Sequence, residues 1–382
     1  MSHQLPVAID DAAIEEFGRE LDAIQREVKA SLGEADRRYI KRMIKIQRGL
    51  AVGGRVLIFA SLPLMPAFPL FLGVIGAGTA ALGLSKILEN MEIGHNVIHG
   101  QWDWMQDPEI HSSTWEWDNV CPADQWKHSH NVVHHTWTNV MGKDRDVGYE
   151  ILRINEAQPW KPVYLAQPFY NALLAVMFQW GVAMHDIDLT RVRKGELKFR
   201  DIRHQLAGIG KKARKQLLKD YVLWPLLAGP LFLPVILANL TANLMRNLWS
   251  YAIIFCGHFP DGAQVFTEAQ VEGETRGRWY LRQTLGSCNI EGGPTFHVLS
   301  GNLSHQIEHH LFPDMPSNRY PEVAPRVRAL CARFGIPYNT GSFARQLGTT
   351  MRTILRLALP TKSKTKTQPE PKTETKTEAL AA

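Results

Sequence analysis

The chain has 382 residues, which is enough for one large domain or two ordinary ones, and a formal net charge of +6. Its hydrophobic content of 45% and its mean hydropathy of -0.19 suit a soluble protein on average, but the apolar residues are concentrated in a few blocks. The four cysteines form no CxxC pair, which argues against a disulfide framework or a thiolate metal site. The cysteine pattern fits a reduced catalytic part that faces the cytosol. The first residues do not resemble a signal peptide.

The N-terminal region predicts an amphipathic helix. Apolar residues recur there at spacings of three and four, at Ile14, Phe17, Leu21, Ile24, Val28 and Leu32. We expect this helix to pack on the rest of the protein rather than to bind a partner. Lys and Arg then accumulate from Arg37 to Arg48, which is typical of a cytosolic flank. Residues 1–46 are therefore interpreted as an N-terminal cytosolic segment.

An uncharged stretch over residues 56–85 predicts a membrane segment. Since about 20 apolar residues span a bilayer, a single straight helix would be too long, and the prolines in this stretch indicate a turn. We therefore predict a helical hairpin over residues 47–90. Its second arm continues into HNVIHG, so that His95 and His99 lie on its cytosolic extension.

A second hairpin is predicted over residues 215–258, where Arg246 is the only charge in a long apolar run interrupted by prolines. Residues 163–184 are also apolar. If this block crossed the membrane once, the histidine-rich segments before and after it would lie on opposite faces, so we place it in the interface or as a re-entrant segment. The loop over residues 186–220 carries eleven Lys and Arg and is predicted to be cytosolic.

The predicted fold is an all-α integral membrane protein with four transmembrane helices in two hairpins and a cytosolic helical cap. We assign residues 47–340 to this membrane domain. Residues 341–382 form a C-terminal segment that ends, from Thr361, in a low-complexity sequence of Lys, Thr, Glu and Pro. Such a composition cannot bury enough apolar surface to order itself, so this tail is predicted to be disordered.

Histidines gather in three short segments, which we call the histidine boxes: HNVIHG, WKHSHNVVHH and HQIEHH. In a helical second box, His130 and His134 share a face and His135 lies beside them, so several imidazoles can converge on one small volume. Neutral imidazole is the commonest metal ligand in proteins. The boxes therefore predict a metal site.

The number of imidazoles exceeds what one metal ion needs, and thiolates are absent from the boxes. Ligation by nitrogen alone, with open positions, suits iron or copper, and the number of ligands predicts two ions. Two irons can bind O2, collect two electrons and remove hydrogen from an unactivated carbon. At the cytosolic mouth of four membrane helices, such a centre would meet an acyl chain whose polar head stays near water.

The order of the boxes and their spacing relative to the hairpins resemble the membrane fatty acid desaturases. WKHSHNVVHHTWTN and NLSHQIEHHLFPDMPSNRYPEVAP are similar to the acyl-CoA and front-end branch, and the resemblance covers residues 48–338. It implies a mushroom-shaped helical enzyme with a histidine-bound di-iron centre, which uses O2 and electrons that originate in NAD(P)H. Each HxxxH alone is a weak signal, whereas the three boxes together are specific.

On this resemblance, the expected metal ligands are His95, His99, His130, His134, His135, His258, His305, His309 and His310. Family members use His or Gln at the ligand position ahead of the final pair His309 and His310, and this chain offers both His305 and Gln306. His258 ends the second hairpin, and its alternative role is an ordinary hydrogen bond at the membrane interface. Some members place a water-bridging Asn four residues before that histidine, where this chain has Ile254.

The positions around the expected ligands receive weaker assignments. Asn243 and Asn247 are only loose substitutes for the missing water-bridging Asn, and Glu308 is expected to orient an imidazole. His128 and His297 lie close to boxes and receive no firm role. We assign no catalytic role to the acidic residues that follow the second box.

Many relatives carry a fused cytochrome b5 domain with an HPGG haem motif, which this sequence lacks. The resemblance therefore implies an external electron carrier, such as a ferredoxin or an NAD(P)H-dependent flavin/iron-sulfur reductase. The basic loop could dock an acidic carrier or coenzyme A phosphates, or be only a solvated basic face. We expect no nucleic acid partner. The expected location is a bacterial cytoplasmic membrane, with the active site and both termini cytosolic.

The function expected from these features is the introduction of a cis double bond into a long-chain acyl group, with acyl-CoA favoured over an acyl-lipid. A related di-iron hydroxylase of alkyl chains or carotenoids would share the boxes. A metal transporter is a third hypothesis, but transporters place their ligands near the bilayer midplane, whereas these boxes follow the apolar runs.

Overall fold

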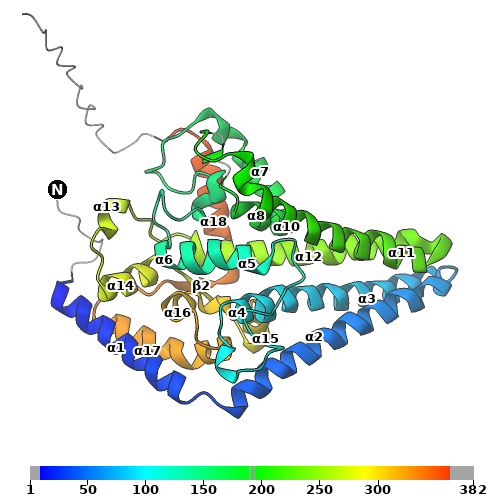
Figure 1. Ribbon diagram of the computed structural model, residues 1–382, viewed down its shortest axis with the longest axis horizontal. Helices are drawn as coiled ribbons and strands as arrows, with labels where there is room; N and C mark the ends of the chain where they lie inside the picture. The colour runs from blue at the N-terminus through cyan, green and yellow to red at the C-terminus, as the bar shows by residue number, and fades with distance from the viewer. Residues whose placement is uncertain (1–8, 189–190, 193, 362–382) are drawn as a thin grey trace, which may run out of the picture.

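The computed structural model describes residues 9–188, 191–192 and 194–361, and it is mostly helical, as predicted (Figure 1). The C-terminal tail that was predicted to be disordered lies, from residue 362 onward, outside the described residues. Two hairpins of long helices point to one side, and shorter helices form a cap at the other side.

The helices and two short strands follow one another along the chain, with η marking short 3-10 or π-helical stretches. They are α1 (Asp11–Ala30), α2 (Glu34–Ser61), η1 (Leu62–Leu64), α3 (Phe68–Leu88), η2 (Glu89–His95), α4 (Asn96–Ile98), η3 (Asp103–Met105), α5 (Ala123–Trp126), η4 (Lys127–His134), α6 (His135–Trp137), η5 (Val147–Glu150), η6 (Pro162–Ala166), α7 (Gln167–Val176), α8 (Phe178–His185), α10 (Phe199–Leu218), η7 (Lys219–Leu223), α11 (Trp224–Leu227), η8 (Gly229–Leu231), α12 (Phe232–His258), α13 (Glu268–Val271), α14 (Arg276–Gly286), β1 (Asn289–Glu291), α15 (Pro294–Leu299), η9 (Leu303–His305), α16 (Gln306–Leu311), η10 (Ser317–Arg319), α17 (Tyr320–Arg333), β2 (Thr340–Ser342) and α18 (Phe343–Ala358).

The N-terminal helix α1 packs on the cap, as its apolar stripe predicts. Five residues of the stripe are buried in one hydrophobic cluster with side chains of α14 and α17, and Leu32 beyond the helix is half-buried. Ion pairs lie along the rim of this contact, including Arg326 with Glu27 at 2.6 Å and Arg333 with Glu20 at 2.8 Å. Helix α1 thereby covers the side of the cap that carries the third box.

The first hairpin consists of α2 and α3, which are joined by a turn at η1 near the predicted prolines. The two helices approach closely at Gly54 and Gly78. A Cβ atom on Gly54 would lie 2.9 Å from the carbonyl oxygen of Gly78, so only glycine allows this crossing. Helix α2 is continuous through residue 46, and α3 passes without interruption into η2 and α4. The first box is therefore a rigid continuation of the second arm.

The second hairpin is formed by the run from α10 to α11 and by α12, with its turn at η8 (Figure 1). Helix α12 packs on α3, which joins the two hairpins. Among the described residues, two helical stretches are long and apolar enough to cross a membrane, Phe68–Ile98 and Gly229–His258. Both stretches end at a histidine box or at His258.

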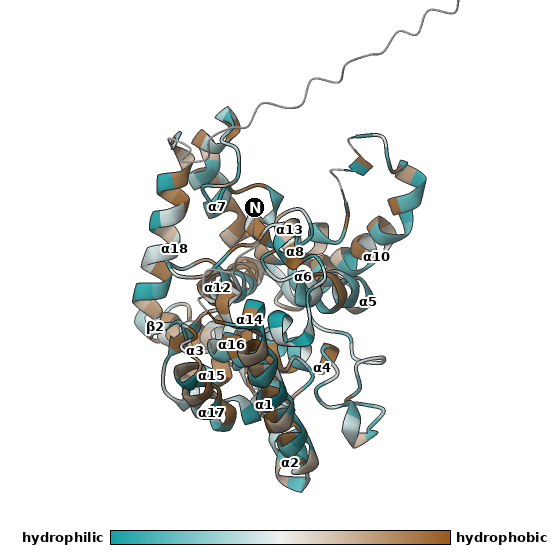
Figure 2. Cartoon of the chain, turned by 90° about the vertical axis from the view of Figure 1, so that its left-hand side faces the viewer, coloured by the Kyte–Doolittle hydropathy of each residue, from teal (hydrophilic) through white to brown (hydrophobic). Residues whose placement is uncertain are grey.

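The apolar block at residues 163–184 does not form one long helix. It is divided into η6, α7 and α8, and Met177 separates the last two. Helices of 10 and 8 residues are too short to span a bilayer. Helix α7 leaves apolar side chains such as Phe169 exposed. It packs on α18, along which hydrophilic and hydrophobic residues alternate in Figure 2. The location of this block in the membrane interface stays a prediction.

The cap holds the third box between packed helices. Helix α16 packs against both α14 and α17. Strands β1 and β2 form a parallel pair beside it, with Ile290 opposite Gly341. Asn289 of β1 accepts a hydrogen bond from the backbone N–H of Ile307 at 2.9 Å, which ties the pair to α16. The core of the cap thus fixes the position of the third box.

Candidate metal centre

The three boxes and the end of α12 meet on the cap side of the hairpins. His95 ends η2, His130 and His134 lie in η4, and the final pair lies in α16. Both η2 and η4 are π-helical, a rare geometry that occurs often at functional sites. The last residue of α12 is His258, so the second hairpin delivers this imidazole to the same place.

The imidazoles form two adjacent clusters, in each of which the candidate ligand atoms lie within 4.8 Å of one another. The first cluster consists of His95, His99, His130 and His309, and the second of His134, His258 and His310. His135 lies between them, because its ring centroid is 4.7 Å from that of His99 and 4.5 Å from that of His310. The arrangement offers ligands for two ions side by side.

His305 lies apart from both clusters. Its ring stacks on that of His297 with centroids 4.5 Å apart, and Nδ1 of His297 is 2.7 Å from the hydroxyl oxygen of Ser304. The neighbouring Gln306 instead turns toward the second cluster, where its Nε2 lies 3.1 Å from Nε2 of His258. Of the two residues that the sequence offered before the final pair, Gln306 is the one beside the clustered histidines.

The hydrogen bonds of the histidines leave one face of each cluster free for metal. Nδ1 of His134 lies 3.0 Å from Asp144, Nδ1 of His310 lies 3.1 Å from Gln283, and Nδ1 of His95 lies 3.1 Å from Asn96. Several Nε2 atoms of the clusters are buried and make no hydrogen bond to the described residues: those of His99, His130, His134, His135, His309 and His310. Nε2 of His305, outside the clusters, is also buried and unpaired among the described residues. The rings of His134, His309 and His310 are each held through Nδ1, while Nε2 is buried without a partner among the described residues. This is the arrangement of metal-binding histidines, so these residues fit a metal centre.

The electrostatics of the clusters favour neutral imidazole. Burial lowers the pKa of His99, His130, His135, His309 and His310 well below the usual value, and neighbouring imidazoles lower it further. His134 is different. Burial would lower its pKa, but the carboxylates of Asp144 and Asp146 outweigh burial and raise the pKa to about 9. These carboxylates place negative charge beside a site that would receive cations.

The remaining predicted positions lie around the clusters. Glu308 is buried and accepts hydrogen bonds from Asn289 and Tyr338, each at 2.8 Å, so its described contacts hold the cap together rather than orient an imidazole. The exposed ring of His128 lies 3.2 Å from Asp186. Asn247 donates to the carbonyl of Val176 at 2.7 Å and lines a cavity that reaches the first cluster.

Two residues of the site were not predicted from the sequence. Asp144 holds His134, and Asp146 lies 3.3 Å from His134 and 3.2 Å from His185. Asp146 also forms a further candidate ligand group with His130 and His134. The only signal for them was their place ten and twelve residues after His134, which carries no helical or strand pattern.

A small cavity of about 50 Å³ opens from the first cluster toward the hairpins. We call it the metal cavity. Its walls combine His95, His130 and His258 with aromatic and apolar side chains such as Trp117, Phe178, Ile254 and Leu303. A hydrocarbon group could therefore lie against the histidines with little water around it.

Comparison with known proteins identifies the family. The family model described as fatty acid desaturase matches residues 69–342. The chain belongs to the fatty acid desaturase family. Membership of this family and the histidine clusters at the end of the hairpins together point to a metal site.

The desaturase is also similar to individual curated proteins. It is 48% identical over 358 residues to a protein of Mycobacterium tuberculosis (strain ATCC 25618 / H37Rv) named NADPH-dependent stearoyl-CoA 9-desaturase, which covers 93% of this chain and 82% of the relative. It is 26% identical to the sn-1 linoleoyl-lipid 6-desaturase of Synechocystis sp. (strain ATCC 27184 / PCC 6803 / Kazusa), over 72% of this chain and 78% of that protein.

Proposed function

We propose that this desaturase introduces a cis double bond into the acyl chain of a long-chain acyl-CoA, with O2 and two electrons from a separate carrier. The observation that carries the proposal is the pair of histidine clusters, with several buried Nε2 atoms unpaired among the described residues, beside a cavity whose walls include aromatic and apolar side chains. Acyl-CoA is favoured over an acyl-lipid because the relative with 48% identity is named a stearoyl-CoA desaturase.

Two irons are the metals that we propose for the centre. The first would be held by His95, His99, His130 and His309, and the second by His134, His258 and His310, with His135 between them. When bound, such a pair supplies O2 activation and the removal of hydrogen from an unactivated carbon. Nitrogen ligands without thiolates suit this metal.

The surrounding residues have their own tasks in the reaction. Asp144 and Gln283 hold the rings of His134 and His310 in place through Nδ1. Trp126 stacks on His130 with centroids 4.2 Å apart and helps to exclude water from the first cluster. The apolar wall at Ile254 and Phe178 would position a methylene group rather than a polar one.

We also propose four membrane crossings, with the metal centre and both termini in the cytosol. Both hairpins carry exposed apolar side chains typical of lipid contact, including Leu70 and Leu72 of α3 and Leu226 and Leu233 of the second hairpin. The basic helix α10 forms the part of the second hairpin's first arm that adjoins the cap, as the positive-inside rule expects of a cytosolic flank. A reporter fused at Gly195 that appears on the outer face would overturn this orientation.

The electrons are proposed to come from NADPH through a separate reductase or ferredoxin. The reaction consumes two electrons, and the relative with 48% identity is named NADPH-dependent. Purified protein with NADPH alone should therefore stay inactive, and addition of a carrier with its reductase should start turnover. Full activity with NADPH alone would contradict this part of the proposal.

Product analysis tests the proposed function. The chain should be expressed in a host without acyl desaturation, with the His309→Ala variant as the inactive control. The proposal expects a new unsaturated acyl species with one located double bond in the wild type and none in the variant. An alcohol in place of the double bond would identify a hydroxylase instead.

A further inference from the structure

A second, much larger cavity lies between the two hairpins and has a volume of about 1150 Å³. We call it the wide cavity. It is bounded by α2 and α3 on one side and by α10, η7 and α11 on the other. Ligand sites typically measure about 300–1,000 Å³, so the wide cavity has room for a long chain, whereas the metal cavity holds little more than a few carbons.

The lining of the wide cavity is amphipathic. Lys211 and Lys215 of α10 line the part that is nearer to the cap, together with Lys212, which is paired with Glu116. Val56, Phe59 and Trp224 line the part that is nearer to the turns of the hairpins. A cationic mouth above an apolar interior suits an amphiphile with an anionic head, and the phosphates of acyl-CoA match the lysines.

The loop residues Trp117 and Asn119 line both cavities, so they form the wall between them. Asn119 donates to Asn90 at 2.9 Å, and Asn90 donates to Ser250 at 3.1 Å, which ties the wall to α12. Trp117 packs on the residue before His95, because a Cβ atom on Gly94 would lie 2.8 Å from Cβ of Trp117. The wall therefore touches the segment that carries the first box.

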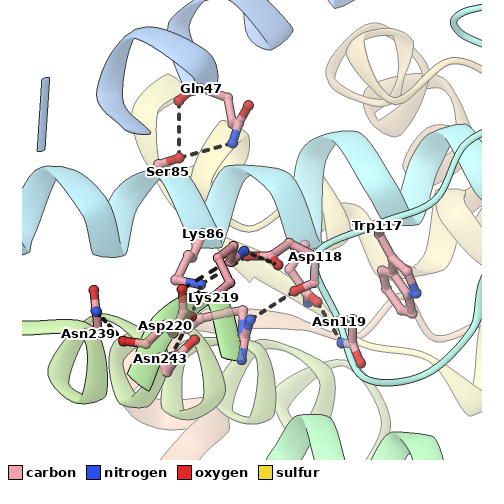
Figure 3. A network of polar contacts seen from close by, with 12 residues as sticks. Gln47, Ser85, Lys86, Trp117, Asp118, Asn119, Lys219, Asp220, Asn239 and Asn243 are labelled. Atoms are coloured by element: carbon pink, nitrogen blue, oxygen red, sulfur yellow. Dashed lines mark hydrogen bonds and ion pairs between the residues drawn. The ribbon is translucent and has the colours of Figure 1, made fainter. Parts of the chain in front are cut away.

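Asp118, between these two wall residues, is held by cations from several elements (Figure 3). Its carboxylate lies 2.9 Å from the amine of Lys86 on α3 and 2.9 Å from the amine of Lys219 on η7. Its carbonyl accepts from Arg246 of α12 at 2.9 Å, and the carbonyl of Trp117 accepts from Lys212 at 2.8 Å. Charged side chains from both hairpins thus fix a short loop.

The same network continues into the hairpins. Asp220, which is fully buried, lies 3.1 Å from Lys86 and 3.3 Å from Arg55. Charged groups at this depth are costly and usually have a function. This network sets the position of a wall between a large and a small cavity.

We propose that the wide cavity receives the acyl-CoA and that Asp118 is a positioning residue, whose ion pairs set where Trp117 and Asn119 stand. The acyl chain must pass this wall to reach the metal cavity, so the position of Trp117 and Asn119 determines which carbons lie beside the histidines and are desaturated. This inference rests on the proposed function. The ion pairs of Asp118 with Lys86 and Lys219 would thus help to determine which carbon–carbon bond of the acyl chain is desaturated.

The test compares Asp118→Asn with the wild type in purified, iron-loaded protein with its electron carrier and acyl-CoA substrates of several lengths. We expect unchanged iron content, a rise in KM of about tenfold from the loss of a charged contact, and more than one double-bond position in the product. Asp118→Glu should restore much of the single product. A single product at the wild-type position with unchanged KM would overturn the role of Asp118.

Asp36→Asn is the matched control, because Asp36 is a buried carboxylate paired with Arg319 in the cap, away from both cavities. It should lower stability and leave the position of the double bond unchanged. If Asp36→Asn shifted the double bond as Asp118→Asn does, the shift would reflect general loosening and the proposal would fail.

A second variant keeps the proposal testable if Asp118→Asn does not fold. Val52 is exposed on α2 and lines the wide cavity, so Val52→Trp should raise KM for long acyl-CoA and spare iron content. Leu70→Trp, on an exposed position of α3 that does not line the cavity, should change neither. An unchanged KM in Val52→Trp would show that the acyl chain does not bind in the wide cavity.

Two outcomes separate this inference from the proposed function. A wild type that forms no double bond from any acyl substrate would refute the proposed function itself. If the wild type desaturates acyl-CoA and both Asp118→Asn and Val52→Trp behave as the wild type does, only the assignment of the wide cavity and its wall is refuted. Turnover of phospholipid vesicles but not of acyl-CoA would refute acyl-CoA as the substrate and with it the assignment of the wide cavity to acyl-CoA.

Discussion

Nδ1 of His134 lies 3.0 Å from a carboxylate oxygen of Asp144, and both side chains are buried. The carboxylate is itself fixed by the backbone, because it accepts from the N–H of Asn139 at 2.8 Å and from that of Asp146 at 3.0 Å. The loop that follows the second box therefore returns to hold one of its imidazoles. This contact leaves Nε2 of His134 as the atom that faces the second cluster.

Asp144→Asn should weaken the metal centre without removing a ligand. The loss of the carboxylate reduces the basicity of His134 and loosens its ring, which typically costs 10–100-fold in metal affinity or activity. The check is iron content after dialysis, followed by turnover. Asp124→Asn, an exposed carboxylate just before the second box, is the control and should retain wild-type iron. Equal iron retention in both variants would rule out this role of Asp144.

The histidines could be predicted from the sequence because their spacing places imidazoles on one face of a helix, and clustered imidazoles have few other uses. The two hairpins were predictable for a similar reason, since uncharged runs and prolines mark their arms and turns. Asp144 could not be predicted in this way. Its contact with His134 depends on a loop whose path follows no repeating pattern.

The choice between His305 and Gln306 also depended on tertiary structure. The sequence offers both, and a difference of one residue turns a side chain to another face of a short helix. In the structure α16 begins at Gln306, so this residue lies beside His258 while His305 remains against His297. The wall at Asp118 was likewise not evident, because its partners come from three separate helices.

His305→Ala and Gln306→Ala should have opposite results. We expect His305→Ala to keep its iron and most of its activity. Among the aromatic rings of the described residues, the ring of His305 contacts only that of His297, which lies outside both clusters. Gln306→Ala should reduce activity, because it removes the side chain that contacts His258. Metal analysis and turnover of the two variants provide the comparison. If His305→Ala loses iron and Gln306→Ala keeps full iron and activity, His305 rather than Gln306 belongs to the metal site.

His258→Ala should lose iron and activity together. His258 lies in the second cluster, where its ring centroid is 4.8 Å from that of His134 and 4.9 Å from that of His310. His111→Ala should lose neither, because His111 lies beside Ser113 and Asp103 near the protein surface. Full iron content in His258→Ala would exclude His258 from the metal ligands.

The stability of the cap should depend on pH through Asp36. Burial would raise the pKa of Asp36, but hydrogen bonds from Arg319, Asn318 and Gly33 outweigh burial and lower the pKa below its usual value of 3.8. A lowered pKa stabilises the folded state above the unfolded pKa, and this stabilisation is lost as the pH falls through the folded pKa. Asp36→Asn should therefore lower the Tm at neutral pH, and its difference from the wild type should shrink below about pH 4. A difference that grows on acidification would contradict this assignment.

The number of irons per chain decides whether the two adjacent histidine clusters hold two metal ions, as we propose. The purified protein should be reconstituted anaerobically with ferrous iron, freed of loosely bound metal and analysed for iron and zinc against protein concentration. We expect two irons per chain in the wild type, one for each cluster. One zinc and no iron per chain would contradict the di-iron centre.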